Sequence, residues 1–187
     1  HHGEVRGRHA ETYLGLAEQS APHVFGSRAK HVLDRLEQDH DNLRLALEWA
    51  NERGELAFAL RYLIAIWRFW QGRGHLEEGW QWVQRVLAMP GIEAEPPALR
   101  ARALGAAGGV AYWYAHVPSA HRFYRDALEQ ARAARDPAIL AKALKDFGFV
   151  PDASLENTTS GLLGPGRAPQ RYGARRRGGG GRRPTQP

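Results

Sequence analysis

Apolar residues recur at spacings of three and four along residues 4–150, with hardly any of the alternation that marks a strand. In residues 28–53, for example, Leu33, Leu36, Leu43, Leu47 and Ala50 fall on one stripe. Because a period of 3.6 residues places such positions on one side of a helix, the pattern predicts an all-α fold. We expect helices at residues 4–21, 28–38, 41–53, 55–72, 76–88, 98–114, 118–134 and 137–149.

Residues typical of helix ends separate these segments. Gly54 stands where a helix C-terminus needs a left-handed residue, and Pro118 suits a first helical turn. Asp136 precedes Pro137, which supplies a capping side chain followed by a residue already fixed in helical φ. Connections this short force neighbouring helices to run antiparallel.

A repeat appears when the helices are taken in pairs. The pattern Leu-x-x-Ile-Trp at residues 63–67 recurs as Leu-x-x-Ala-Gly at 104–108 and Leu-x-x-Phe-Gly at 144–148. In the first two pairs a small residue follows twelve positions later, at Gly79 and Ala120. This order is typical of tetratricopeptide repeats, in which small residues let two helices approach closely. We therefore expect an α-α superhelix of antiparallel helix pairs over residues 54–150, preceded by N-terminal helices in residues 1–53.

The composition changes at about residue 151. Residues 151–187 contain eight Gly, five Pro and seven Arg against two acidic residues, which gives this segment +5 of the total net charge of +6. Such a segment cannot bury enough apolar surface to offset the entropy lost on ordering. We expect a disordered Gly/Pro/Arg-rich tail at 151–187 and a nearly neutral folded part before it.

Three segments resemble the helical region of bacterial STAND-type (NB-ARC-like) regulators: RHAETYLGLAE at residues 8–18, LDRLEQDHDNLRLALEW at 33–49 and LEEG at 76–79. In that family a nucleotide-binding ATPase module and a winged helix precede tetratricopeptide repeats, often with a DNA-binding domain at one end. The resemblance covers residues 4–150. It implies that this chain is the repeat-containing sensor portion, and the first residue, a His rather than Met, fits a piece of a longer protein.

The sequence offers no recognisable catalytic or cofactor site. It lacks the G-x-x-x-x-G-K-[ST] loop that binds nucleotide phosphates, and it has no cysteine. Its nine histidines show no H-E-x-x-H spacing, and its serines show no G-x-S-x-G setting. We expect no enzyme activity, no cofactor and no metal site. The aromatic residues are expected mainly in the core, with Trp67 and Trp70 on one buried face.

Helix direction in these repeats suggests a binding surface, because the first helix of each pair lines the concave side. The positions expected there are Arg61, Arg68, Gln71, Arg102, Tyr112, Trp113, Lys142 and Lys145. Five of the eight are basic, which favours acidic peptides, carboxylate termini or phosphate groups. The alternative is that these charges are only a solvated helix face.

The sequence thus predicts a protein-protein interaction or sensor module, with roles in signal transduction and transcription regulation implied by the resemblance. Its expected partners are a protein or acidic peptide, or other domains of the parent regulator. The alternative function is nucleic-acid binding through the Arg/Gly-rich tail. Without a long apolar segment or a signal sequence, we expect a bacterial cytoplasmic protein with no membrane contact.

Overall fold

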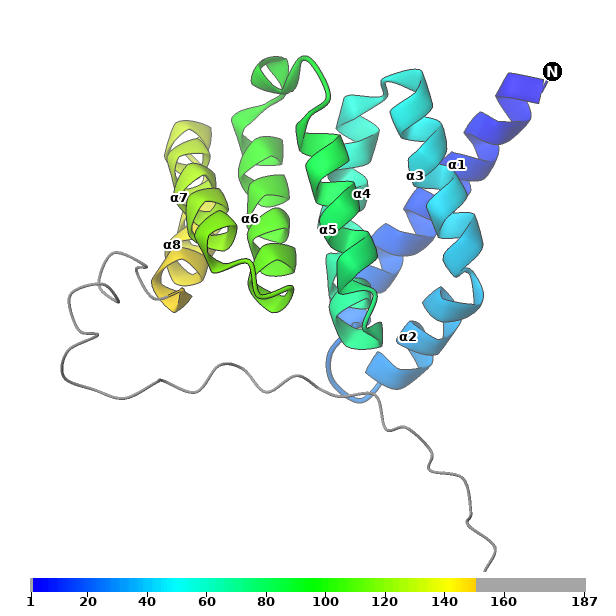
Figure 1. The fold of residues 1–187 in the computed structure, drawn as a ribbon, viewed down its shortest axis with the longest axis horizontal. Helices are drawn as coiled ribbons and strands as arrows, with labels where there is room; N and C mark the ends of the chain where they lie inside the picture. Colours follow the sequence, from blue (N-terminus) through cyan, green and yellow to red (C-terminus); the bar gives the residue numbers. More distant parts are fainter. Residues whose placement is uncertain (1, 151–187) are drawn as a thin grey trace, which may run out of the picture. The chain divides into compact units, whose positions relative to one another are not determined.

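The computed structural model describes residues 2–150, which fold into α-helices and two short 3₁₀ turns without a strand (Figure 1). The α-helices are α1 (His2–Ser20), α2 (Ala29–Gln38), α3 (His40–Arg53), α4 (Leu56–Arg73), α5 (Leu76–Leu87), α6 (Pro97–Trp113), α7 (Val117–Ala134) and α8 (Pro137–Phe149). The all-α prediction is confirmed, and each predicted boundary lies within two residues of the observed one. The predicted disordered tail, 151–187, lies outside the described residues.

The predicted helix ends are confirmed at several positions. Gly54 ends α3 with a φ of 72°, in the left-handed region that favours glycine. Asp136 caps α8, because its carboxylate accepts hydrogen bonds from the backbone N–H groups of Ala138 at 2.8 Å and Ile139 at 3.2 Å. Pro118 lies in the first turn of α7. These local signals fix where each helix starts and stops.

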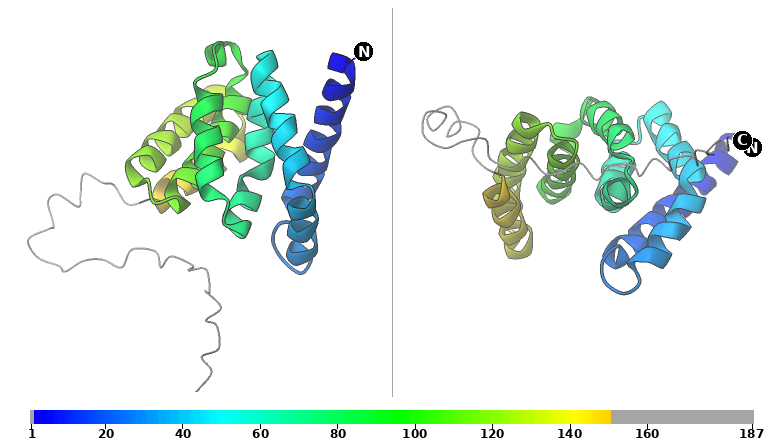
Figure 2. Two further views of the ribbon diagram at one scale, coloured as in Figure 1. Left: turned by 45° about the vertical axis from the view of Figure 1, so that its right-hand side comes forward. Right: turned by 60° about the horizontal axis from the view of Figure 1, so that its bottom comes forward.

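After Asp39 the chain bends and α3 continues α2 in nearly the same direction, whereas from α3 onward successive helices run antiparallel (Figures 1 and 2). One core cluster extends from α1 to α7 and includes Leu14, Leu47, Leu63 and Val83, all almost fully buried. The N-terminal helices are tied to α4 within this core, since the buried Tyr62 hydroxyl donates a hydrogen bond of 2.7 Å to the carbonyl oxygen of Leu43. Helices on both sides of Gly54 therefore contribute to one apolar core.

Two glycines allow the paired helices to approach closely. A Cβ built on Gly79 of α5 would lie 2.8 Å from Cε3 of the buried Trp70 in α4. A Cβ on Gly108 of α6 would lie 2.7 Å from Cε1 of Tyr124 in α7. Both distances are too short for real carbon contacts, so the absence of a side chain lets each ring lie against the facing backbone. Gly108 thus faces the partner helix, as the repeat pattern predicts.

None of the helices between residues 2 and 150 combines the length and the hydrophobicity required to traverse a lipid bilayer.

Candidate functional site

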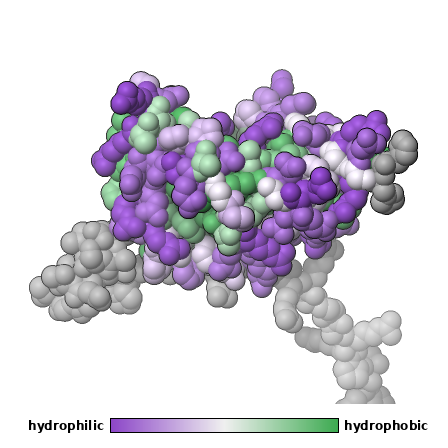
Figure 3. Space-filling model, turned by 90° about the horizontal axis from the view of Figure 1, so that it is seen from above, coloured by the Kyte–Doolittle hydropathy of each residue, from purple (hydrophilic) through white to green (hydrophobic). Residues whose placement is uncertain are grey.

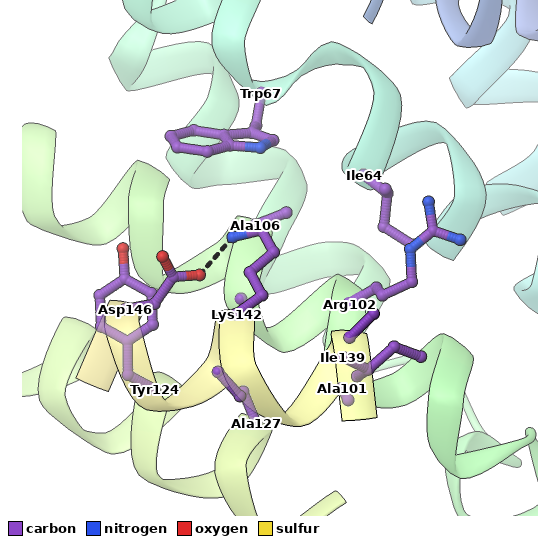
Figure 4. A pocket seen from close by; sticks show the side chains of 13 residues that line it. Ile64, Trp67, Ala101, Arg102, Ala106, Tyr124, Ala127, Ile139, Lys142 and Asp146 are labelled. Carbon is purple, nitrogen blue, oxygen red and sulfur yellow. Dashed lines mark hydrogen bonds and ion pairs between the residues drawn. The ribbon is translucent and has the colours of Figure 1, made fainter. Parts of the chain in front are cut away.

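A pocket of about 300 Å³ opens between α4, α6, α7 and α8 (Figure 4). It is lined by Ile64, Trp67, Ala101, Arg102, Gly105, Ala106, Tyr124, Ala127, Ala138, Ile139, Lys142, Ala143 and Asp146. On α6 the lining is mostly small, with Ala101, Gly105 and Ala106 beside Arg102. These small residues leave space between the helices that larger side chains would fill.

Trp67 forms one side of the pocket and is fixed by its neighbours. A Cβ built on Gly109 would lie 2.6 Å from Cη2 of the Trp67 ring, so only a glycine at that position leaves room for the ring. The guanidinium carbon of Arg68 lies 3.7 Å from the Trp67 ring centroid and 4.9 Å from that of Phe25. Arg68 also donates a hydrogen bond of 2.8 Å to Oε1 of Gln71. These contacts hold the indole ring at the pocket wall.

The opposite side of the pocket carries the polar groups of α8 (Figure 4). Lys142 donates a hydrogen bond to the carboxylate of Asp146, which neutralises both charges locally. Burial raises the pKa of the Tyr124 hydroxyl well above its ordinary value, and the negative charge of Asp146 raises it further. Tyr124 is therefore neutral at physiological pH and offers the pocket a hydroxyl that can donate or accept.

Arg102 is the one cation of the pocket lining without an ion-pair partner in residues 2–150. It lies on α6 and its side chain is exposed. A fully charged guanidinium beside an apolar cavity can bind a carboxylate through two parallel hydrogen bonds. The pocket thus combines an apolar interior with one positive charge available to a ligand.

The structure places the eight residues predicted for binding in several different environments. Arg102 and Lys142 line the pocket. Arg61 instead forms an ion pair of 2.8 Å with Glu18 of α1, and hydrogen bonding to that carboxylate raises the pKa of the Arg61 guanidinium. Lys145 is exposed and is not among the residues that line the pocket.

The remaining four predicted residues form two contact groups. Arg68 and Gln71 hydrogen-bond to each other beside Trp67, and burial lowers the pKa of Arg68. Tyr112 packs edge-to-face against Trp113, with ring centroids 5.8 Å apart. The eight residues therefore do not form one continuous row of free charges, and their role in binding stays a prediction.

Sequence reasoning predicted Arg102 and Lys142 for binding but not the other residues that shape the pocket. Trp67 was expected in the core beside Trp70. It packs against the core that contains Trp70 but is only partly buried, whereas Trp70 is 2% exposed. Asp146 gave no signal of its own, because its spacing is also that of an ordinary helix position. The neighbourhood of Asp146 depends on how α8 packs against α6 and α7.

A second cluster of polar residues lies away from this pocket. Glu37, His40 and His75 each place one potential ligand atom within 4.8 Å of the others. No metal site was expected from the sequence, because its histidines do not show the local spacing of zinc motifs. Here the residues come from the ends of α2, α3 and α4–α5, so their proximity arises from tertiary packing alone.

One face of the described helices, seen in Figure 3, is largely hydrophilic around patches of hydrophobic surface between the helices. Exposed large apolar residues are also present, including Leu144 and Phe149 of α8, which are 49% and 62% exposed.

Comparison with known proteins finds related sequences in mycobacteria. Three proteins, each named "Putative HTH-type transcriptional regulator", from Mycobacterium bovis and two strains of Mycobacterium tuberculosis, are 32% identical to this chain over 151 residues. The match covers 78% of this chain but only 17% of each relative. No family model matches the chain, and no solved structure matches it. The chain is thus related to a small part of proteins named as transcriptional regulators.

Proposed function

We propose that this chain is a non-catalytic interaction module of a regulator, and that the pocket between α4, α6, α7 and α8 binds a protein segment carrying an acidic and an apolar side chain. The observation that carries the proposal is Arg102, which lines a largely apolar cavity and has no ion-pair partner within residues 2–150. Similarity to a portion of much longer proteins named as transcriptional regulators supports a regulatory context.

The size and lining of the pocket support a side-chain ligand. A volume of about 300 Å³ is at the lower end for small-molecule sites and suits one or two side chains of a bound peptide. The lining has Asp146 as its single carboxylate and contains no histidine, serine or threonine. Such a set can bind and orient a ligand but lacks the paired groups used in nucleophilic or acid–base catalysis.

The bound segment has two candidate sources, because this chain matches only part of longer proteins. Because the chain spans about a sixth of its curated relatives' length, a segment of the same parent protein is one candidate partner, and a separate signalling protein is another. In STAND-type regulators, which residues 33–49 resemble, this arrangement would make the repeat region the sensor of a signal.

The proposal is tested by selecting peptides from a random display library on the full 187-residue chain. The affinity of a selected peptide is then measured for the parent, for Arg102→Glu and for Arg132→Glu. Arg132 is an exposed arginine of α7 outside the pocket, so it controls for the change in net charge. We expect selected peptides to contain Asp or Glu, and Arg102→Glu to weaken binding at least tenfold while Arg132→Glu leaves it unchanged.

The arginine-rich segment at 151–187 requires a control experiment of its own, because its positive charge attracts any polyanion. The same measurement is repeated on a chain ending at Ala153, the end of the first compact unit. Peptide binding that disappears with this truncation, or that weakens equally in both arginine variants, contradicts the proposal. Salt-dependent binding of nucleic acid that disappears with the truncation would favour the alternative function.

A further inference from the structure

Two Glu/His pairs meet where the junction of α2 and α3 lies against the start of α5. Glu37 and His40 are three positions apart, and so are His75 and Glu78. Each histidine contacts the carboxylate of the other pair, 38 residues away in the chain. Nε2 of His75 lies 3.0 Å from both carboxylate oxygens of Glu37, and Nε2 of His40 lies 3.1 Å from Oε1 of Glu78.

The two imidazole rings lie next to each other on an aromatic support. Their centroids are 4.2 Å apart, and Phe69 of α4 contacts both rings, at 5.3 Å from His40 and 5.4 Å from His75. Phe69 is fully buried, so the rings rest on a rigid core residue. Two protonated rings would repel each other at this distance, whereas two neutral rings present nitrogen lone pairs to a cation.

We propose that Glu37, His40 and His75 bind a Zn²⁺ ion and that Glu78 holds the His40 ring in position. The three ligand atoms lie within 4.8 Å of one another. In tetrahedral zinc, with ligand bonds of about 2.0–2.2 Å, neighbouring ligand atoms are about 3.4 Å apart. Side-chain rotations that move each ligand atom inward by about 1 Å would therefore bring the three atoms to zinc-binding distance. Two imidazoles and one carboxylate are a ligand set that zinc uses with a water in the fourth position.

The surroundings of the cluster fit ion entry and ligand orientation. The side chains of His40, His75 and Glu37 are 16%, 27% and 42% exposed, so the site opens to solvent on the Glu37 side. Glu78 accepts from one ring nitrogen of His40 and thereby leaves the other nitrogen for the metal, as outer carboxylates commonly do at zinc sites. Nε of Arg44 lies 3.9 Å from Oε1 of Glu78, which orients that carboxylate further.

A metal here would cross-link two parts of the fold. Glu37 and His40 belong to the helices that precede the first repeat pair, and His75 immediately precedes α5 of that pair. Zinc binding would therefore stabilise the packing of α2 and α3 on α4 and α5, at a site separate from the pocket lined by Trp67 and Arg102.

The test is calorimetric titration of the chelator-treated, full-length chain with ZnCl₂, with the melting temperature followed in parallel. We expect one high-affinity ion per chain and a higher melting temperature in zinc. His75→Ala and Glu37→Gln should abolish the one-to-one binding. Glu78→Gln should retain it with affinity lowered by about 10- to 100-fold. Co²⁺ in place of Zn²⁺ should give the visible absorption of a four-coordinate ion.

Two controls separate this site from other histidines. His31 is exposed on α2 outside the cluster, so His31→Ala should bind zinc like the parent. His1 and His2 are adjacent at the start of the chain and could bind zinc themselves, so the pair is also replaced by alanine. Zinc binding that survives His75→Ala, or that is lost when His1 and His2 are replaced, overturns the proposal. A parent chain that binds no zinc at micromolar concentration overturns it as well, leaving only two His–Glu hydrogen-bonded pairs.

Discussion

The guanidinium carbon of Arg68 lies 3.7 Å from the ring centroid of Trp67, so a residue expected to be a free surface charge instead fixes a wall of the pocket. Gly109 leaves room for the edge of the same ring. The indole is therefore held on its face by a cation and at its edge by a backbone without a side chain. Substitution of Arg68 or Gly109 should therefore alter the position of the Trp67 ring and the shape of the pocket, although neither residue is part of the pocket lining.

Arg68→Met should destabilise the fold by about 1–2 kcal/mol, because it removes the cation–π contact and the hydrogen bond to Gln71 while keeping an apolar stem. Arg132→Met is the matched control, since Arg132 is exposed and makes no ring contact within residues 2–150. Urea unfolding of the parent and both variants measures the change in the free energy of unfolding. Equal stability of the two variants would show that the Arg68–Trp67 contact contributes nothing.

A pair of glycine substitutions tests the close approach of α6 and α7. In an unobstructed helix, Gly→Ala stabilises by about 0.5–1 kcal/mol, and a Cβ added to Gly15 of α1 would meet no atom within 4 Å. At Gly108 the added Cβ would lie 2.7 Å from the buried Tyr124 ring, and overpacking of this kind costs about 1–3 kcal/mol. We expect Gly15→Ala to raise the melting temperature and Gly108→Ala to lower it. A rise in both would mean that the two helices are farther apart than described.

The stability of the chain should depend on pH through Asp34. A hydrogen bond from Lys30, followed by one from Arg73, holds the pKa of Asp34 below its ordinary value. A carboxyl whose pKa is lowered by folding stabilises the fold above its unfolded-state pKa, about 3.9, and this contribution is lost as pH falls through the lower folded-state value. Asp34→Asn should therefore lower stability at pH 7 and have a smaller effect at pH 3.

The control for this pH dependence is Asp41→Asn, because the Asp41 side chain is 94% exposed. Thermal unfolding of the parent and both variants at pH 7 and pH 3 gives the comparison. An effect of Asp34→Asn that is the same at both pH values would contradict the assigned ion pairs.

Sequence reasoning located the helices well because their signals are local. The apolar period, the left-handed glycine at Gly54 and the capping carboxylate of Asp136 each act within a few residues, so their consequences follow from the sequence alone. The eight predicted helices are all present for this reason.

The site was less predictable because it depends on contacts between distant residues. Arg61 was assigned to a free concave surface, but its partner Glu18 is 43 residues away, and no local pattern reveals that pairing. The Trp67 ring lines a pocket only because Gly109, on another helix, lets it approach. His40 and His75 likewise meet only because the α2–α3 junction packs against the start of α5.

Filling the pocket tests its role in binding without changing any charge. A Cβ built on Gly105, in the pocket lining, would meet only Oδ2 of Asp146, at 3.8 Å, so a side chain there can extend into the cavity. Gly105→Leu should occupy the space that a ligand side chain needs while leaving Arg102 in place. Gly15→Leu is the control, because Gly15 is also a helical glycine with open space beside it but lies on α1.

The most direct measurement is therefore the affinity of a library-selected acidic peptide for the parent chain, Gly105→Leu and Gly15→Leu, determined by calorimetry with the melting temperature of each variant recorded. We predict that Gly105→Leu weakens binding at least tenfold at an unchanged or higher melting temperature, and that Gly15→Leu binds like the parent. Equal affinity of all three chains for the peptide would contradict the assignment of the pocket as the binding site.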